Sequence, residues 1–160
     1  MSDERQVLDI GEQEAISDAL MLMIQQSPMI IGRRITTRYE DMATGVIGLF
    51  TQQGTVYLQR YLSGSFAAQY SFCLRYRIKP STDEQKISEQ ERLDAIAKWL
   101  EGQKVTYGGQ EILPPEYPEL TDRRTIEQIT RTSNAVLEAV YQDGAVDYVE
   151  YLTLRYRKQN

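Results

Sequence analysis

The sequence contains no histidine and only one cysteine, Cys73, in 160 residues. Histidine is the commonest general base, the commonest metal ligand and the usual pH switch, so its absence removes the ordinary candidates for those roles. A single cysteine excludes a disulfide or a multi-cysteine zinc site within one chain. Because a nucleophilic Cys73 would have no histidine to activate it, we interpret Cys73 as a small strand residue.

Recognisable catalytic motifs are missing as well. The Gly108–Gly109 pair lies in a proline-rich stretch and opens no helix, unlike the glycine loops that hold phosphates. The Ser63–Ser65 segment is a turn signal rather than a nucleophile elbow. Neighbouring carboxylates such as Glu89 and Glu91 lie near predicted helix starts, where acidic side chains cap the helix and contact solvent. We therefore predict a protein that is not an enzyme, with no catalytic residue, no metal site and no cofactor.

Long apolar runs and an excess of positive charge are also absent. No run reaches the roughly 20 residues of a membrane helix, so we expect no membrane partner. The first residues are mostly acidic and do not form a signal peptide, which predicts use in a cytoplasm. A net charge of −5 argues against a general nucleic-acid binder and leaves only a local basic stripe open. The length suits one domain over residues 1–160.

The sequence does contain one long alternating segment, Ser65–Lys79. Its even-numbered residues are apolar or aromatic and its odd-numbered residues become basic, which predicts a strand with one buried face. The segment ends before Pro80, which cannot donate a hydrogen bond to a sheet. The Leu-Arg-Tyr-Arg sequence of residues 74–77 recurs at residues 154–157, so we expect two strands of the same pattern to share one sheet.

Two helices are predicted, over Glu12–Gln26 and Ser81–Gly102. Each has apolar residues at i, i+3, i+4 and i+7, and Ser81 and Ser88 compete as the start of a capping box in the second. A hairpin turn is predicted at Asp143-Gly144. Residues 44–62 could instead form a long loop, but the patterns favour further strands at residues 30–39, 46–50, 56–62, 125–132, 135–141 and 146–157.

The order helix, strands, helix, strands predicts an α+β fold, in which a mixed or antiparallel sheet packs against two helices on one face. This arrangement is ferredoxin-like in spirit, and the repeated Leu-Arg-Tyr-Arg sequence fits two αββ halves. The basic tail, which consists of Arg155, Arg157 and Lys158, is expected to leave the sheet at the end of the last strand.

Basic residues gather on the face of the two long strands that is opposite the predicted core: Arg75, Arg77, Lys79, Arg155 and Arg157. If the strands are neighbours, these side chains form a positive stripe that faces either an acidic partner or a lumen through which DNA passes. The alternative is a solvated sheet face that nearby glutamates neutralise. We expect Arg75 and Arg155 to be exposed, so that their reversal to glutamate would impair assembly and leave the fold nearly intact.

The stretch Gln103–Leu120 is the least regular part of the chain, with two glycines and three prolines. Loops of this length inside compact domains are often functional, and this composition suggests contact rather than chemistry. We predict that the stretch contacts a neighbouring subunit through Tyr107, Ile112, Leu113 and Tyr117.

The order of these elements resembles that of the tail terminator proteins of long-tailed bacteriophages, which are also called minor capsid proteins. The matching pieces are an N-terminal helix, a strand that ends in basic residues, a central helix and a last strand: Glu12–Gln26, Phe66–Lys79, Leu93–Leu100 and Tyr148–Arg157. The resemblance covers most of the chain and rests on the pattern of elements, without a diagnostic motif. It therefore assigns no role to an individual residue.

The resemblance implies a structural virion protein that forms a ring, typically of six subunits, at the head-proximal end of a phage tail tube. The ring would stop tube growth and join the tail to the head connector. Its partners would be further copies of the chain, the tail tube protein and the head connector or stopper protein, with transient contact to passing DNA. Such a protein assembles in the bacterial cytoplasm and resides in the tail or neck of the virion. Two alternatives remain: another neck or head-completion protein, or a small cytoplasmic enzyme or ligand-binding module of ferredoxin-like fold.

Overall fold

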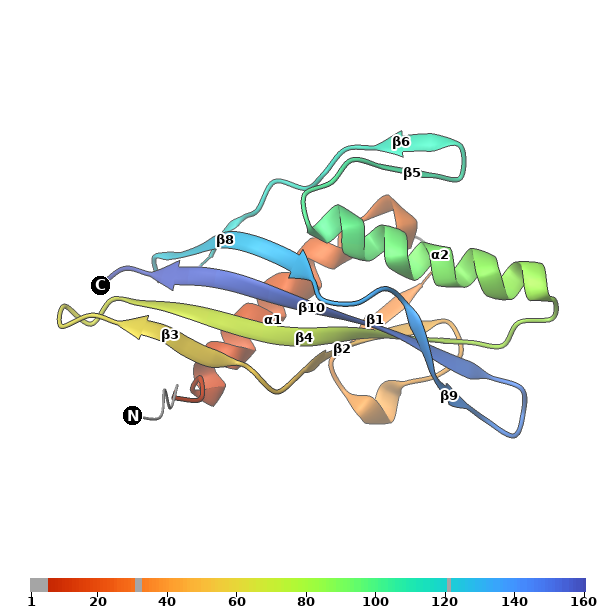
Figure 1. Ribbon diagram of the computed structural model, residues 1–160, viewed down its shortest axis with the longest axis horizontal. Coiled ribbons are helices and arrows are strands. Elements are labelled where there is room, and N and C mark those ends of the chain that lie inside the picture. The colour runs from red at the N-terminus through yellow and green to blue at the C-terminus, as the bar shows by residue number, and fades with distance from the viewer. Residues whose placement is uncertain (1–5, 31–32, 121) are drawn as a thin grey trace.

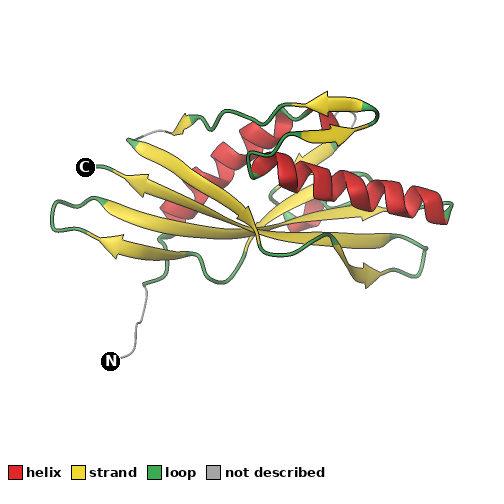
Figure 2. Ribbon diagram, turned by 45° about the horizontal axis from the view of Figure 1, so that its top comes forward, coloured by secondary structure: helices red, strands yellow, loops and turns green. Residues whose placement is uncertain are grey.

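The computed structural model describes residues 6–30, 33–120 and 122–160, in which two helices lie on one face of a curled sheet (Figures 1 and 2). The helices are α1 (Ile10–Gln25) and α2 (Asp83–Leu100), and two short 3-10 turns, η1 (Pro28–Ile30) and η2 (Tyr39–Asp41), follow α1. Eight strands form the sheet: β1 (Arg34–Thr36), β2 (Val46–Thr51), β3 (Val56–Arg60), β4 (Phe66–Ile78), β7 (Glu119–Leu120), β8 (Arg124–Arg131), β9 (Val136–Val140) and β10 (Val146–Lys158). A separate hairpin consists of β5 (Val105–Tyr107) and β6 (Gln110–Ile112).

The two longest strands, β4 and β10, form the centre of the sheet and pair antiparallel along their whole length. Each carries two shorter antiparallel strands on its outer edge: β2 and β3 on β4, and β8 and β9 on β10. β1 extends the sheet parallel to β2, and β7 extends it antiparallel to β8. The predicted mixed sheet with two helices is confirmed, but its eight strands exceed a simple ferredoxin-like arrangement.

An approximate twofold axis passes through the centre of the sheet. Phe72 and Leu152 each stand two residues before a copy of the Leu-Arg-Tyr-Arg sequence, and they are direct partners in the register. The strands that flank β4 and β10 correspond under the same operation. β2 and β8 pair with the C-terminal parts of the long strands, and β3 and β9 with the N-terminal parts. Apart from β1, β7 and the β5–β6 hairpin, each half is therefore αβββ, whereas the repeated sequence suggested two αββ halves.

The core lies between the sheet and the helices, and the strict alternation of β4 produces it. Phe66, Ala68, Tyr70, Phe72, Leu74, Tyr76 and Ile78 are all buried, as the alternation predicts. Apolar side chains of α1 and α2 cover both strands, and on β10 the apolar residues of the same face are also buried: Val146, Tyr148, Leu152, Leu154 and Tyr156. Burial of apolar surface contributes about 25 cal/mol per Å², which makes this layer the main source of stability.

The ends of α2 are determined by local chemistry. Its N-cap is Thr82, whose side chain accepts a hydrogen bond from the backbone of Gln85, and neither Ser81 nor Ser88 occupies that position. At the other end Gly102 has φ of +88°, the left-handed conformation that commonly follows the last turn of a helix and that glycine adopts easily. Trp99 in the last turn of the helix is buried and donates its indole N–H to the Leu113 carbonyl at 2.9 Å.

The last strand is longer than predicted. Residues 155–158 do not leave the sheet, because β10 pairs with both β4 and β8 as far as Lys158. The predicted strand within residues 30–39 is reduced to the three residues of β1, and residues 31–32 lie outside the described part of the chain. None of the helices described has the length and hydropathy of a membrane span.

Candidate interaction surfaces

A buried ion network lies at one end of the β4–β10 pair, on the face opposite the helices. The fully buried Asp147 accepts hydrogen bonds from Arg75 at 2.6 Å, from Arg77 at 2.8 Å and from Tyr141 at 2.7 Å. Burial alone would raise the pKa of Asp147, but these hydrogen bonds hold it below its ordinary value. Arg75 also contacts Glu138 of β9 at 3.1 Å. Both arginines of the first Leu-Arg-Tyr-Arg copy are therefore held by carboxylates.

This network changes the expectation for Arg75. Its side chain is only 16% exposed, so it is not the solvent-facing cation that the alternation suggested. Replacing it by glutamate would place a second negative charge beside the buried Asp147. Reversal of Arg75 would therefore damage the fold as well as any interface.

The arginines of the second copy lie at the opposite end of the strand pair, since β4 and β10 are antiparallel. Arg155 is exposed, and Arg157 contacts Glu127 of β8 at 3.0 Å with about half of each side chain exposed. Lys79 is exposed just beyond the end of β4, near the first group. The predicted stripe is thus divided into two groups, and only Arg155 and Arg157 lie at the far end. A role of the five residues in an interface stays a prediction.

The predicted contact loop packs mostly against its own chain. Tyr117 donates its hydroxyl to the carbonyl of Leu100 at 2.7 Å, and Tyr107 lies under the Arg92 guanidinium, 5.3 Å from ring centre to carbon. Ile112 packs against the edge of the core. Leu113 differs from these residues because it is 71% exposed. Of the four predicted contact residues, Leu113 is the one whose side chain is largely available to a partner.

Two tyrosine–glutamate hydrogen bonds connect the helices to the sheet. Tyr76 of β4 donates its hydroxyl to Glu89 of α2, and Tyr156 of β10 donates its hydroxyl to Glu12 of α1 at 2.9 Å. Burial, followed by the hydrogen bond to Glu89, raises the pKa of Tyr76 to about 12. Glu89 is buried, so the expectation of a solvated carboxylate at this helix start is wrong. Arg124 completes the second pair through two hydrogen bonds to the Glu12 carboxylate.

An acidic cluster lies under α2 around Glu150, which interrupts the apolar face of β10. Glu150 is fully buried, and within the described residues neither carboxylate oxygen has a hydrogen-bond partner. Burial and the nearby Asp94 carboxylate raise the pKa of Glu150 to about 9. Arg131 lies 3.7 Å away and binds Asp94 and Glu101, each at 2.7 Å. Glu150 is therefore neutral near pH 7, and only a proton would let it share a hydrogen bond with Asp94.

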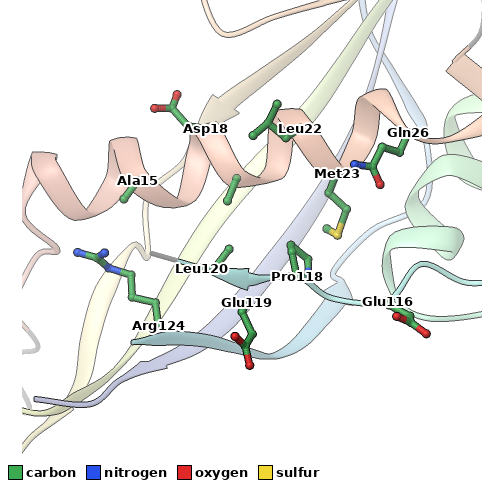
Figure 3. A pocket seen from close by; sticks show the side chains of 11 residues that line it. Ala15, Asp18, Leu22, Met23, Gln26, Glu116, Pro118, Glu119, Leu120 and Arg124 are labelled. Atoms are coloured by element: carbon green, nitrogen blue, oxygen red, sulfur yellow. The ribbon is translucent and has the colours of Figure 1, made fainter. Parts of the chain in front are cut away.

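A pocket of about 440 Å³ lies between α1 and the segment that leads into β7 (Figure 3). Met23 and Gln26 extend from the helix toward Pro118, and Leu120 lies on the opposite wall. Glu119 is among the acidic residues that line it. The lining combines alkyl surface with carboxylates and has no nucleophile paired with a base, so it is suited to contact rather than catalysis.

The remaining titratable candidate is Cys73, which is buried on the far face of β4. Burial raises the pKa of its thiol to about 11, so it is protonated near pH 7, as expected of a structural cysteine. Among the residues that the structure describes, no group of three or more acidic or cysteine side chains is arranged to hold a metal ion.

The edge strand β9 forms a further surface, which the sequence does not predict. Three of its apolar side chains are exposed: Val136, Leu137 and Val140, the last at 69%. The sequence predicts the strand from its hairpin turn, but it contains no signal that β10 is the one strand of the described chain that pairs with β9. That edge is a consequence of the order of the strands.

Comparison with known proteins identifies a similar fold and no sequence family. No protein-family model matches the chain, and no curated protein matches it. Among solved structures, the fold is similar to that of a chain in the virion of a native gene transfer agent particle, with a TM-score of 0.54. The likeness covers 89% of this chain and 98% of that chain, at 10% sequence identity. At this identity it shows a shared fold, and function has to be argued separately.

Proposed function

We propose that the chain is a structural subunit of a phage-like virion. The observation that carries the proposal is the similarity in fold to a chain of a gene transfer agent virion, which includes almost the whole of both chains. The order of elements that resembles the tail terminator proteins supports the same class of protein. A structural role requires surfaces for assembly and no catalytic group.

Within that class, we propose a ring of six subunits at the head-proximal end of the tail tube. The ring ends tube growth and binds the head connector or stopper protein on its other side. A ring needs two different surfaces on each subunit that fit one another. The exposed edge of β9 and the exposed Leu113 supply apolar contact area of the kind that such interfaces use.

The same proposal assigns the Arg155 and Arg157 group to an acidic partner or to the lumen. Arg155 is exposed, and Arg157 retains about half of its exposure despite its contact with Glu127. Exposed cations on a protein of net charge −5 favour a local contact with an acidic surface or with DNA in transit over general nucleic-acid binding.

Electron microscopy of the purified chain, alone and mixed with the tail tubes of its own phage, tests the proposal. A closed ring, or density at one end of each tube, is the expected result. Density along the whole tube would overturn the terminator role. Monomers that bind portal complexes and do not bind tubes would overturn it as well. Binding to portal complexes would favour another neck protein.

A further inference from the structure

The edge of β9 is open where the corresponding edge in the other half of the chain is covered. β3 occupies the place of β9 under the approximate twofold axis. Residues 6–8 run along β3, where Leu8 donates to the Thr55 carbonyl at 3.1 Å and Tyr57 donates to the Gln6 carbonyl at 2.9 Å. Within the described residues, β9 pairs with β10 and with no other strand. The fold thus protects one of two equivalent edges and leaves the more apolar one unpaired.

Unpaired edges with exposed apolar side chains favour addition of another strand. Val136, Leu137 and Val140 stay 43%, 46% and 69% exposed, and the only charged residue of β9 is Glu138. Natural sheets discourage pairing at free edges with lysine, proline or very short strands, and this five-residue edge has neither lysine nor proline. The sequence of β9 therefore favours pairing of its outer edge with a further strand.

At the same end of the sheet lies a matching edge that, within the described residues, pairs with no further strand. At that end the strands follow the order β1, β2, β4, β10, β9, so β1 is the opposite edge. β1 runs antiparallel to β9, because it is parallel to β2 and three antiparallel pairings separate β2 from β9. β1 carries the exposed Arg34, and a hollow of about 480 Å³ lies beside it, lined by Ile35 and Met42 among others.

We propose that the β9 edge of one subunit pairs antiparallel with the β1 edge of a second copy of the chain, an inference that rests on the proposed ring. Charge and sheet faces select the register. Arg34 lies opposite Glu138, Ile35 opposite Leu137, and Thr36 opposite Val136. Ile35 and Leu137 then share the helix-covered face, since their neighbours Ile47 and Tyr148 both belong to the core.

This pairing is heterologous, because two different edges meet. Repeated around an axis parallel to the strands, a heterologous contact closes into a ring when the rotation divides a full turn, whereas contact between two β9 edges would stop at a dimer. Glu138 would be shared between Arg75 of its own subunit and Arg34 of the neighbour. The interface therefore extends the ion network around Asp147 across the subunit boundary.

Disulfide crosslinking tests the register directly. Directly opposed residues in an antiparallel pair have Cα atoms about 4.5–5.5 Å apart, which is within the range that a disulfide spans. The double variant Thr36→Cys with Val136→Cys is oxidised with and without tail tubes, beside each single variant. The native Cys73 is buried and serves as the background in all three. We expect a ladder of covalent oligomers, ending at the ring size, in the double variant and monomers in both single variants.

The other outcomes separate the β1–β9 pairing from the terminator role. Covalent dimers from Val136→Cys alone would show that two β9 edges meet. Rings visible by electron microscopy without a ladder would overturn the β1–β9 contact and leave the terminator role intact. A complete ladder from a protein that ignores tube ends would support the contact and overturn the terminator role. Monomers without a ladder, even beside tubes, would overturn both.

A surface variant provides a second measurement. Leu137→Lys places a charge at the centre of the proposed interface, and Leu62→Lys makes the same change at the fully exposed turn between β3 and β4. We expect Leu137→Lys to lower the fraction of subunits in rings at least tenfold and Leu62→Lys to leave it unchanged. Equal ring yields for the two variants would contradict the proposed interface.

Discussion

Tyr76 and Tyr156 occupy the same position in the two Leu-Arg-Tyr-Arg copies, and each donates its hydroxyl to a glutamate of a different helix. The acceptors are Glu89 of α2 and Glu12 of α1. An arginine binds each glutamate in turn, Arg92 at 3.0 Å and Arg124 at 2.6 Å. The repeated sequence therefore marks two points where side-chain hydrogen bonds join the sheet to the helices.

Removing one hydroxyl from these pairs should weaken the fold. We expect Tyr156→Phe to lower the free energy of unfolding by roughly 1.5–3 kcal/mol, because a hydrogen bond to a charged, partly buried carboxylate is lost. Urea denaturation followed by circular dichroism measures the change. Tyr61→Phe, at a more exposed tyrosine in the β3–β4 turn, is the matched control. An equal, small effect in both variants would contradict a fastening role for Tyr156.

The face pattern of β4 was predictable from its sequence, whereas the partners of its polar residues were not. Alternation in Ser65–Lys79 identifies the buried face because a strand has a period of two. The same period says nothing about register with β10, so it could not show that Asp147 lies opposite Arg77. Glu12 lies 144 residues from Tyr156 in the chain, and no local pattern connects them.

Removing the buried carboxylate of the far-face network should cost more than removing an exposed charge. We expect Asp147→Asn to destabilise the protein by about 3–5 kcal/mol, because it leaves Arg75 and Arg77 partly buried without their counter-ion. Thermal or chemical denaturation measures the loss. Arg155→Glu, on an exposed position of the same sheet face, should change stability by less than about 0.5 kcal/mol. Similar losses in both variants would show that the network adds no stability.

Glu150 should make the protein less stable as the pH rises. Its pKa is raised from 4.5 to about 9 in the folded chain, so the unfolded chain releases this proton first. Stability therefore falls between about pH 4.5 and pH 9, by at most about 1.4 kcal/mol per pH unit. The sequence has no histidine to titrate in this window.

Chemical denaturation of wild type and Glu150→Gln at pH 5, 7 and 9 isolates this contribution. The variant keeps the shape of the side chain and cannot ionise, so it should lose most of the pH dependence and exceed the wild type in stability at pH 9. Glu91→Gln, at an exposed position of α2, is the control. Parallel pH curves for wild type and Glu150→Gln would mean that Glu150 is already ionised in the folded protein.

For the candidate surfaces too, the sequence predicts local features such as turns, but not contacts between residues that are far apart in the chain. Turn chemistry at Asp143-Gly144 correctly predicts the hairpin that contains β9. The free edge of β9 follows from the order of strands in the sheet, which depends on pairings between residues far apart in sequence. Within Gln103–Leu120, composition alone cannot separate Tyr117, which binds α2, from the exposed Leu113.

Charge reversal at the second Leu-Arg-Tyr-Arg copy should affect assembly and leave folding almost unchanged. In the double variant Arg155→Glu with Arg157→Glu, only the exposed contact of Arg157 with Glu127 is lost within the described residues, so the urea midpoint should stay close to that of the wild type. If the group faces an acidic partner or DNA, binding to tube ends or passage of DNA should fall, and added salt should weaken wild-type binding. Tube-end occupancy by electron microscopy and infectivity in a complementation assay measure the two effects. The control is the double variant Lys86→Glu with Lys104→Glu, which makes the same change in charge on the helix side of the molecule. Equal occupancy and infectivity in both double variants would assign Arg155 and Arg157 to a solvated sheet face instead.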